Sequence, residues 1–155
     1  MTCDYSEKEI VRLTRIAIGV LQENDAFLLE TKCHERAIAH KLAEYLQDQF
    51  PDWNVDCEYN LQGQEIKILK RIRECSEHKK TDRIFPDIIV HKRNEKADLL
   101  VIELKKRKLN SKCDIKKLQL FTDQSGDYHY ALGLFVQFDG MQPNLKWFRN
   151  GRQID

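Results

Sequence analysis

The stretch of sequence that decides the fold is residues 84–105, which reads IFPDIIVHKRNEKADLLVIELK. It contains two runs of β-branched and aliphatic residues, 84–90 and 98–104, on either side of a polar segment. Two such runs around a turn-forming segment predict an antiparallel hairpin. With the turn midway between the runs, paired positions sum to about 190, and this register places Asp87 opposite Glu103.

The hairpin is expected to bring two carboxylates together. Because strand side chains alternate between faces, Glu103 and Lys105 share one face, while Ile102 and Leu104 point into the core. Asp87 and Glu103, directly opposite, would have Cβ atoms about 4.5–5.5 Å apart, and their repulsion costs stability unless a proton or a cation relieves it. An oxygen-only pair suits Mg²⁺, which binds one or two carboxylates and keeps several waters. Mn²⁺ accepts the same ligands, and the backbone carbonyl of Leu104 would add one more.

The residues outside the hairpin change from helical to alternating periodicity. Ser6 and Glu9 form a capping box, and apolar residues at helical spacing follow them. The predicted elements, in order, are helices at 6–22 and 31–49, a strand at 53–60, the two hairpin strands, a helix at 111–123, a central apolar strand at 130–138 and an edge strand at 145–148. Residues 26–29 are expected to be a short apolar connector. This order predicts a mixed α/β layer structure.

The composition is that of one globular domain. The 155 residues fit a single domain over 1–155, and 41% hydrophobic with 33% charged residues is typical of a soluble globule. No apolar run approaches the roughly 18–20 residues of a membrane span, and no charged-then-apolar leader opens the chain, so we expect no membrane partner. Five Cys residues without a CxxC pair argue against a disulfide framework and favour a cytoplasmic protein.

Positive charge is concentrated in the middle of the chain. Residues 65–117 hold 17 Lys and Arg against 9 Asp and Glu, whereas residues 1–64 hold 6 against 12. Such a block is either a solvated face or a surface for a polyanion. The candidate contacts to a nucleic-acid backbone are Arg83, Arg93, Lys106, Arg107, Lys108 and Lys117.

Pro86-Asp87 together with Glu103-Leu104-Lys105 resembles the signature of the PD-(D/E)xK nuclease superfamily, which has the restriction endonuclease-like fold. That fold places a helix before a three-strand meander, then a helix and a further strand (αβββαβ). The predicted order over residues 31–138 is similar, with one extra helix in front. By this resemblance Asp87 and Glu103 are metal ligands and Lys105 is the catalytic lysine. Glu35, in Cys33-His34-Glu35-Arg36, would be an outer ligand or would organise water.

The resemblance implies a Mg²⁺-dependent, endonuclease-like enzyme that hydrolyses phosphodiester bonds in DNA with a metal-activated water. RNA is the alternative substrate within the same class. A homodimer would present two sites to the two strands of a duplex, and assembly into a larger complex is the other arrangement considered. Three alternatives stay open: an inactive nucleic-acid-binding module on the same fold, a scaffolding subunit, and a surface hairpin in which Glu103 merely pairs with Lys105.

Three further residues are expected to have only structural roles. Cys57 and Cys113 are interpreted as small buried side chains, because free cysteine behaves as a hydrophobe. Lys116, in the predicted helix at 111–123, is expected to be exposed to solvent.

Overall fold

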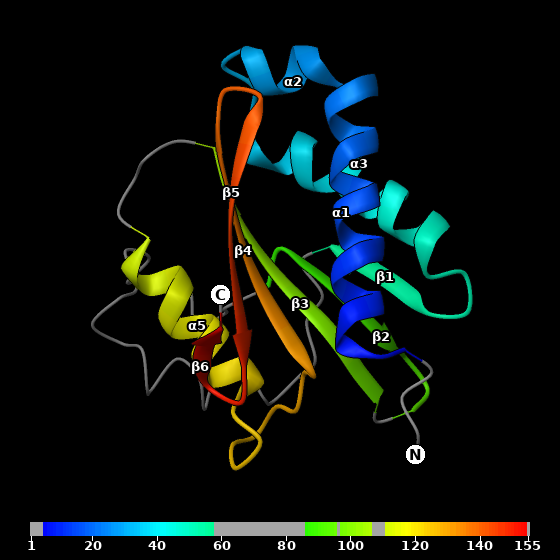
Figure 1. The fold of residues 1–155 in the computed structure, drawn as a ribbon, viewed down its shortest axis with the longest axis vertical. Coiled ribbons are helices and arrows are strands. Elements are labelled where there is room, and N and C mark those ends of the chain that lie inside the picture. Colours follow the sequence, from blue (N-terminus) through cyan, green and yellow to red (C-terminus); the bar gives the residue numbers. More distant parts are fainter. Residues whose placement is uncertain (1–4, 58–85, 96, 107–110, 155) are drawn as a thin grey trace.

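The computed structural model describes residues 5–57, 86–95, 97–106 and 111–154 (Figure 1). They form an α/β structure around a mixed six-stranded sheet of order β1-β2-β3-β4-β5-β6. Strands β3 and β4 are parallel, and every other neighbouring pair is antiparallel. The strands are β1 (Asn54–Cys57), β2 (Ile88–Lys92), β3 (Ala97–Lys105), β4 (Leu132–Asp139), β5 (Gln142–Arg149) and β6 (Arg152–Ile154).

Helices cover both faces of the sheet (Figure 1). They are α1 (Glu7–Asn24), α2 (Ala26–Glu30), α3 (Glu35–Gln49) and α5 (Lys112–Thr122). Ile88 and Val90 of β2 belong to the core shared with α1 and α3, whereas Ile89 belongs to the smaller core beneath α5. The period-2 alternation of a strand therefore divides the hydrophobic residues between two layers. No helix in these ranges combines the length and hydrophobicity needed to cross a bilayer.

The hairpin has the predicted register. Ile88 pairs with Ile102, and the next two pairs continue the same register as far as Val90. Extended by one residue beyond Ile88, this register sets Asp87 opposite Glu103. A bulge between Val90 and His91 shifts the remaining pairs, away from the acidic end.

The first helix begins as predicted, because Ser6 and Glu9 form both hydrogen bonds of the capping box. The segment after it differs from the prediction. Residues 26–30 form α2 rather than a connector, and α3 begins at Glu35 instead of residue 31. The burial of Leu29 and the bond from the Thr31 hydroxyl to the Phe27 carbonyl favour a separate helical turn here.

The predicted edge position of the strand near residue 145 was wrong. β5 is eight residues long and pairs on its outer side with β6, which becomes the edge. Asn150 and Gly151 join the two strands with φ values of 48° and 76°. A two-residue Asn-Gly turn with positive φ at both positions matches the right-handed twist of a hairpin, which is why this pair returns the chain. β4 lies inside the sheet between β3 and β5, as its apolar sequence predicts.

Candidate active site

Four elements bring polar side chains to one end of the sheet. Glu35 is the first residue of α3, and Asp87 immediately precedes β2. Glu103 and Lys105 lie at the end of β3. Helix α5 adds side chains from its first turns, and it packs closely on β4 because Gly133 has no Cβ: one added there would lie 3.0 Å from Thr122 Cγ2.

The carboxylate of Glu103 is buried, with 1% of the residue exposed. Its Oε1 has no hydrogen-bond partner among the residues that the structure describes. Asp87, on the neighbouring strand, accepts a hydrogen bond at Oδ2 from the backbone N–H of Leu104 at 2.7 Å. An unpartnered buried oxygen is expensive, so a proton or a cation is expected at Glu103 Oε1.

Burial raises the pKa of both carboxyl groups. For Glu103 the pKa is raised well above its usual range, chiefly by loss of solvation, with the Lys117 ammonium opposing the shift and Asp87 and Asp114 adding to it. For Asp87 loss of solvation also raises the pKa, against the bond from Leu104. Two adjacent carboxyl groups that have both lost solvation resist being charged together, and positive charge beside them favours the charged forms.

Two lysines approach the carboxylates from the α5 side. Lys117 Nζ lies 3.1 Å from Glu103 Oε2 and 3.7 Å from Asp114 Oδ1. Lys105 Nζ lies 3.5 Å from the other oxygen of Asp114. Glu103 and Lys105 therefore share one face, as predicted, but in the described part of the chain Glu103 pairs with Lys117 instead of Lys105. Asp114 lies between the two ammonium groups.

Lys105 is positively charged in this setting. Burial acts to lower its pKa, but attraction to Asp114 and Glu35 outweighs burial, and the pKa is raised. The pKa of Lys117 is also raised, because attraction to Glu103, Asp114 and Asp87 outweighs burial. Both lysines are thus ammonium groups at neutral pH.

A hollow of about 250 Å³ opens beside the carboxylates. Its lining residues are Glu35, Arg36, Ala39, His40, Cys57, Asp87 and Leu104. Three of the predicted site residues therefore border the same space, with Glu35 oriented by the backbone N–H of Lys106, 3.3 Å from its Oε1. Arg36 and His40, one helical turn apart on α3, were not predicted from the sequence to belong to the site.

The donor set fits a hard cation bound by few protein ligands. Among the described residues no group of three or more His, Cys, Asp and Glu is placed to hold a metal ion. Mg²⁺ needs only one or two carboxylates beside its waters, and Asp87 with the unpartnered Glu103 Oε1 meets that requirement. Leu104 contributes its N–H to Asp87, and a ligand role for its carbonyl stays a prediction.

The residues predicted to contact nucleic acid differ in their surroundings. Arg83, Arg107 and Lys108 lie outside the described residues. Lys117 is only 17% exposed at its side chain and faces the acidic groups. Lys106 directs its ammonium to Cys33, with Nζ 3.6 Å from the sulfur.

Arg93 is held by an acidic residue of β1. Its Nε donates to Asp56 Oδ2 at 2.9 Å, and a second guanidinium nitrogen contacts Oδ1. The same Asp56 oxygen lies 2.7 Å from Nε2 of His91, which is buried. The Arg93 bond is the main reason that the pKa of Asp56 is lowered. Asp56 and Arg93 are 37 residues apart, so no local spacing in the sequence indicates this pair.

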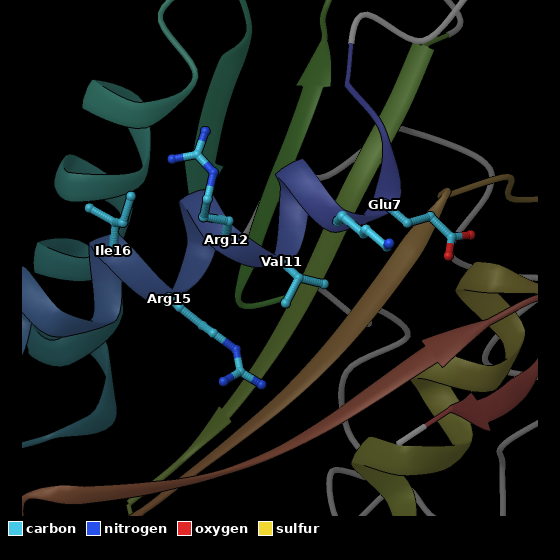
Figure 2. Close-up of a pocket in the computed structure, with 6 residues that line it drawn as sticks. Glu7, Val11, Arg12, Arg15 and Ile16 are labelled. Atoms are coloured by element: carbon cyan, nitrogen blue, oxygen red, sulfur yellow. The ribbon is translucent and has the colours of Figure 1, made fainter.

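A second, shallow hollow of about 610 Å³ lies along α1 (Figure 2). It is lined by Glu7, Lys8, Val11, Arg12, Arg15 and Ile16 and shares no residue with the hollow beside Asp87. Figure 2 shows Arg12 and Arg15 diverging from the helix. None of the residues that line this hollow along α1 is a buried polar residue. The candidate site is therefore the hollow beside Asp87.

Two expectations about side chains need correction. Cys57 is exposed rather than buried, and it borders the hollow beside Asp87. It lies on β1, which among the described strands pairs only with β2. Cys113 and Lys116 are half-buried on α5. Asp114 was missed, although its spacing of three residues from Lys117 on a helix indicates that the two side chains can meet.

No family model matches the chain, and a search of curated proteins gives no match. The buried Glu103, with one oxygen unpartnered among the described residues, and the half-buried Asp87 lie beside two ammonium groups and a hollow. Carboxylate oxygens suit a hard cation, and ammonium groups suit an anion.

Proposed function

We propose that this chain is a Mg²⁺-dependent nuclease of the PD-(D/E)xK type that hydrolyses phosphodiester bonds in DNA. The observation that carries the proposal is the buried Glu103, whose Oε1 has no partner among the described residues, next to Asp87 at the border of a hollow. The order of the described elements α3, β1, β2, β3, α5 and β4 adds support, because it is similar to the αβββαβ order that the resemblance implies, with residues 58–85 outside the described part.

Asp87 and Glu103 would hold the ion, and Glu35 would orient water at the far side of the hollow. When bound, Mg²⁺ lowers the pKa of a water and offsets charge on the phosphate. Lys105 is a charged donor whose side chain is 26% exposed, held by Asp114. Because its pKa is raised, Lys105 serves to stabilise negative charge on the phosphate rather than to remove a proton.

A cleavage panel tests the proposal. The substrates are DNA and RNA of one sequence, each as duplex and single strand, with Mg²⁺, Mn²⁺ or EDTA. We expect metal-dependent cleavage of DNA by the wild type and none by Lys105→Ala. Lys116→Ala is the matched control, because Lys116 is a lysine on α5 outside the site, and it should cleave like the wild type. Equal cleavage by Lys105→Ala and the wild type would contradict the role of Lys105, and cleavage in EDTA would contradict the metal.

One observation favours an inactive binding or scaffolding protein as the second candidate. The Lys117 ammonium already compensates the charge of Glu103 without a metal. A binding module would retain DNA in a salt-sensitive manner and leave it intact with either metal. A scaffolding subunit would bind DNA weakly and be indifferent to Lys105→Ala. RNA cleavage without DNA cleavage would keep the enzyme class and change its substrate.

A further inference from the structure

We infer that the site takes a single divalent ion, and that the ammonium of Lys117 fills the place of a second one. This inference rests on the proposed function, because it concerns the same carboxylates. The motif formed by Asp87, Glu103 and Lys105 does not say how many ions bind. The inference states that number and gives Lys117 a role.

The first argument concerns which carboxylate oxygens are committed. Asp87 Oδ2 accepts the N–H of Leu104, and Glu103 Oε2 receives the ammonium of Lys117 at 3.1 Å. Glu103 Oε1 accepts no hydrogen bond from the other described residues, and the Asp87 and Glu103 carboxyl groups lie within hydrogen-bonding distance of each other. Two carboxyl groups in contact can bond only through a shared proton, so one ion that displaces this proton finds oxygens of both groups as ligands. A two-metal centre, with ions about 3.5–4 Å apart, needs carboxylate oxygens for both.

The second argument concerns how firmly Lys117 is held. Its side chain is 17% exposed and contacts Glu103 on one side and Asp114 on the other. The next residue of α5, Leu118, is fully buried in the core between this helix and the sheet, so the backbone at this turn is held against the sheet. Moving the ammonium away would leave the buried Glu103 and Asp114 without this partner, which is costly. Lys117 therefore stays in place when an ion binds.

The third argument concerns the space that Lys117 occupies. Its Nζ lies between Glu103 Oε2 and Asp114 Oδ1, which are oxygens of two buried acidic residues. Two carboxylate oxygens are a suitable ligand pair for a divalent ion. Removing the ammonium exposes that pair, so truncation of Lys117 is expected to create a second cation site.

Titration calorimetry with Mn²⁺ and no nucleic acid tests the inference on the full chain. Electron paramagnetic resonance of free Mn²⁺ gives an independent count of bound ions. We expect one ion per chain for the wild type, one for the control Lys116→Ala and two for Lys117→Ala. Circular dichroism verifies folding, and Lys117→Ser, which is neutral and also leaves the space of the ammonium empty, replaces the alanine variant if that one does not fold.

The outcomes separate this inference from the proposed function. Two ions on the wild type, or one ion on both the wild type and a folded Lys117 variant, would overturn the role of Lys117 while leaving a metal-dependent nuclease intact. No bound ion on the wild type would overturn both. One ion on the wild type and two on the Lys117 variant would support the inference, whatever substrate the cleavage panel identifies.

Discussion

Lys117 on α5 donates to Glu103 on β3 with 3.1 Å between Nζ and Oε2, and this ion pair joins a helix to the strand that ends at the candidate site. Glu103 is almost fully buried, so the pair is formed away from water. Removing one partner of a buried pair leaves an uncompensated charge, and its stability effect is far larger than that of an exposed pair.

Lys117→Ala is therefore expected to destabilise the metal-free protein by up to about 3–5 kcal/mol at a pH where Glu103 is ionised, because Glu103 loses its buried counter-ion. Urea unfolding in EDTA measures the loss. The double variant Lys117→Ala/Glu103→Gln should recover part of it, since the amide carries no charge to bury. If the double variant loses as much as the two single variants added together, the two side chains are not coupled.

Metal-free stability should fall as pH rises from acid toward neutral. Glu103 has a usual pKa of 4.5, and its folded value is raised by burial, so the folded state binds the proton more tightly than the unfolded chain. Its contribution is complete below about 4.5 and is lost as pH passes the raised folded pKa; Asp87 acts in the same direction. Thermal unfolding in EDTA between pH 5 and 8 measures the slope, which Glu103→Gln should reduce. A flat profile in the wild type would contradict the shifted pKa.

Lys105→Ala should abolish cleavage with little loss of stability. The Lys105 side chain is partly exposed, and its ion pair with Asp114 spans 3.5 Å, so we expect a loss of no more than about 1 kcal/mol. Loss of a charge-stabilising donor typically lowers kcat by about 10²–10³-fold. Cleavage rates and unfolding curves on the same preparation separate the two effects. A strongly destabilised variant would assign Lys105 to the fold instead.

Asp56→Asn should destabilise the protein and leave the chemistry unchanged. It removes the charged partner of Arg93 and weakens the bond to the buried His91, at a cost of about 1–3 kcal/mol. Because the pKa of Asp56 is lowered, its contribution is present above the usual value of 3.8 and is lost as pH falls through the folded value. Chemical unfolding at pH 7 and pH 3 measures both effects. A large fall in the cleavage rate of folded Asp56→Asn would place the pair within the active site.

The sequence by itself determined the hairpin and the position of Asp87 opposite Glu103. Both follow from local rules: strand periodicity sets the faces, and the position of the turn sets the register from Ile88 to Val90. The capping box likewise located the start of α1, since it involves residues three apart.

Only the tertiary structure decided what surrounds that pair. Lys117 and Asp114 reach Glu103 and Lys105 because α5 packs closely over β4 at Gly133, and Glu35 borders the same hollow because α3 lies on the opposite face of the sheet. Arg93, a predicted phosphate contact, forms an ion pair with Asp56 of β1. These contacts depend on how the helices pack on the sheet, and that packing is driven by burial of hydrophobic surface. Because such burial does not depend on the spacing of residues in the sequence, neither the nuclease motif nor the charge pattern could predict these contacts.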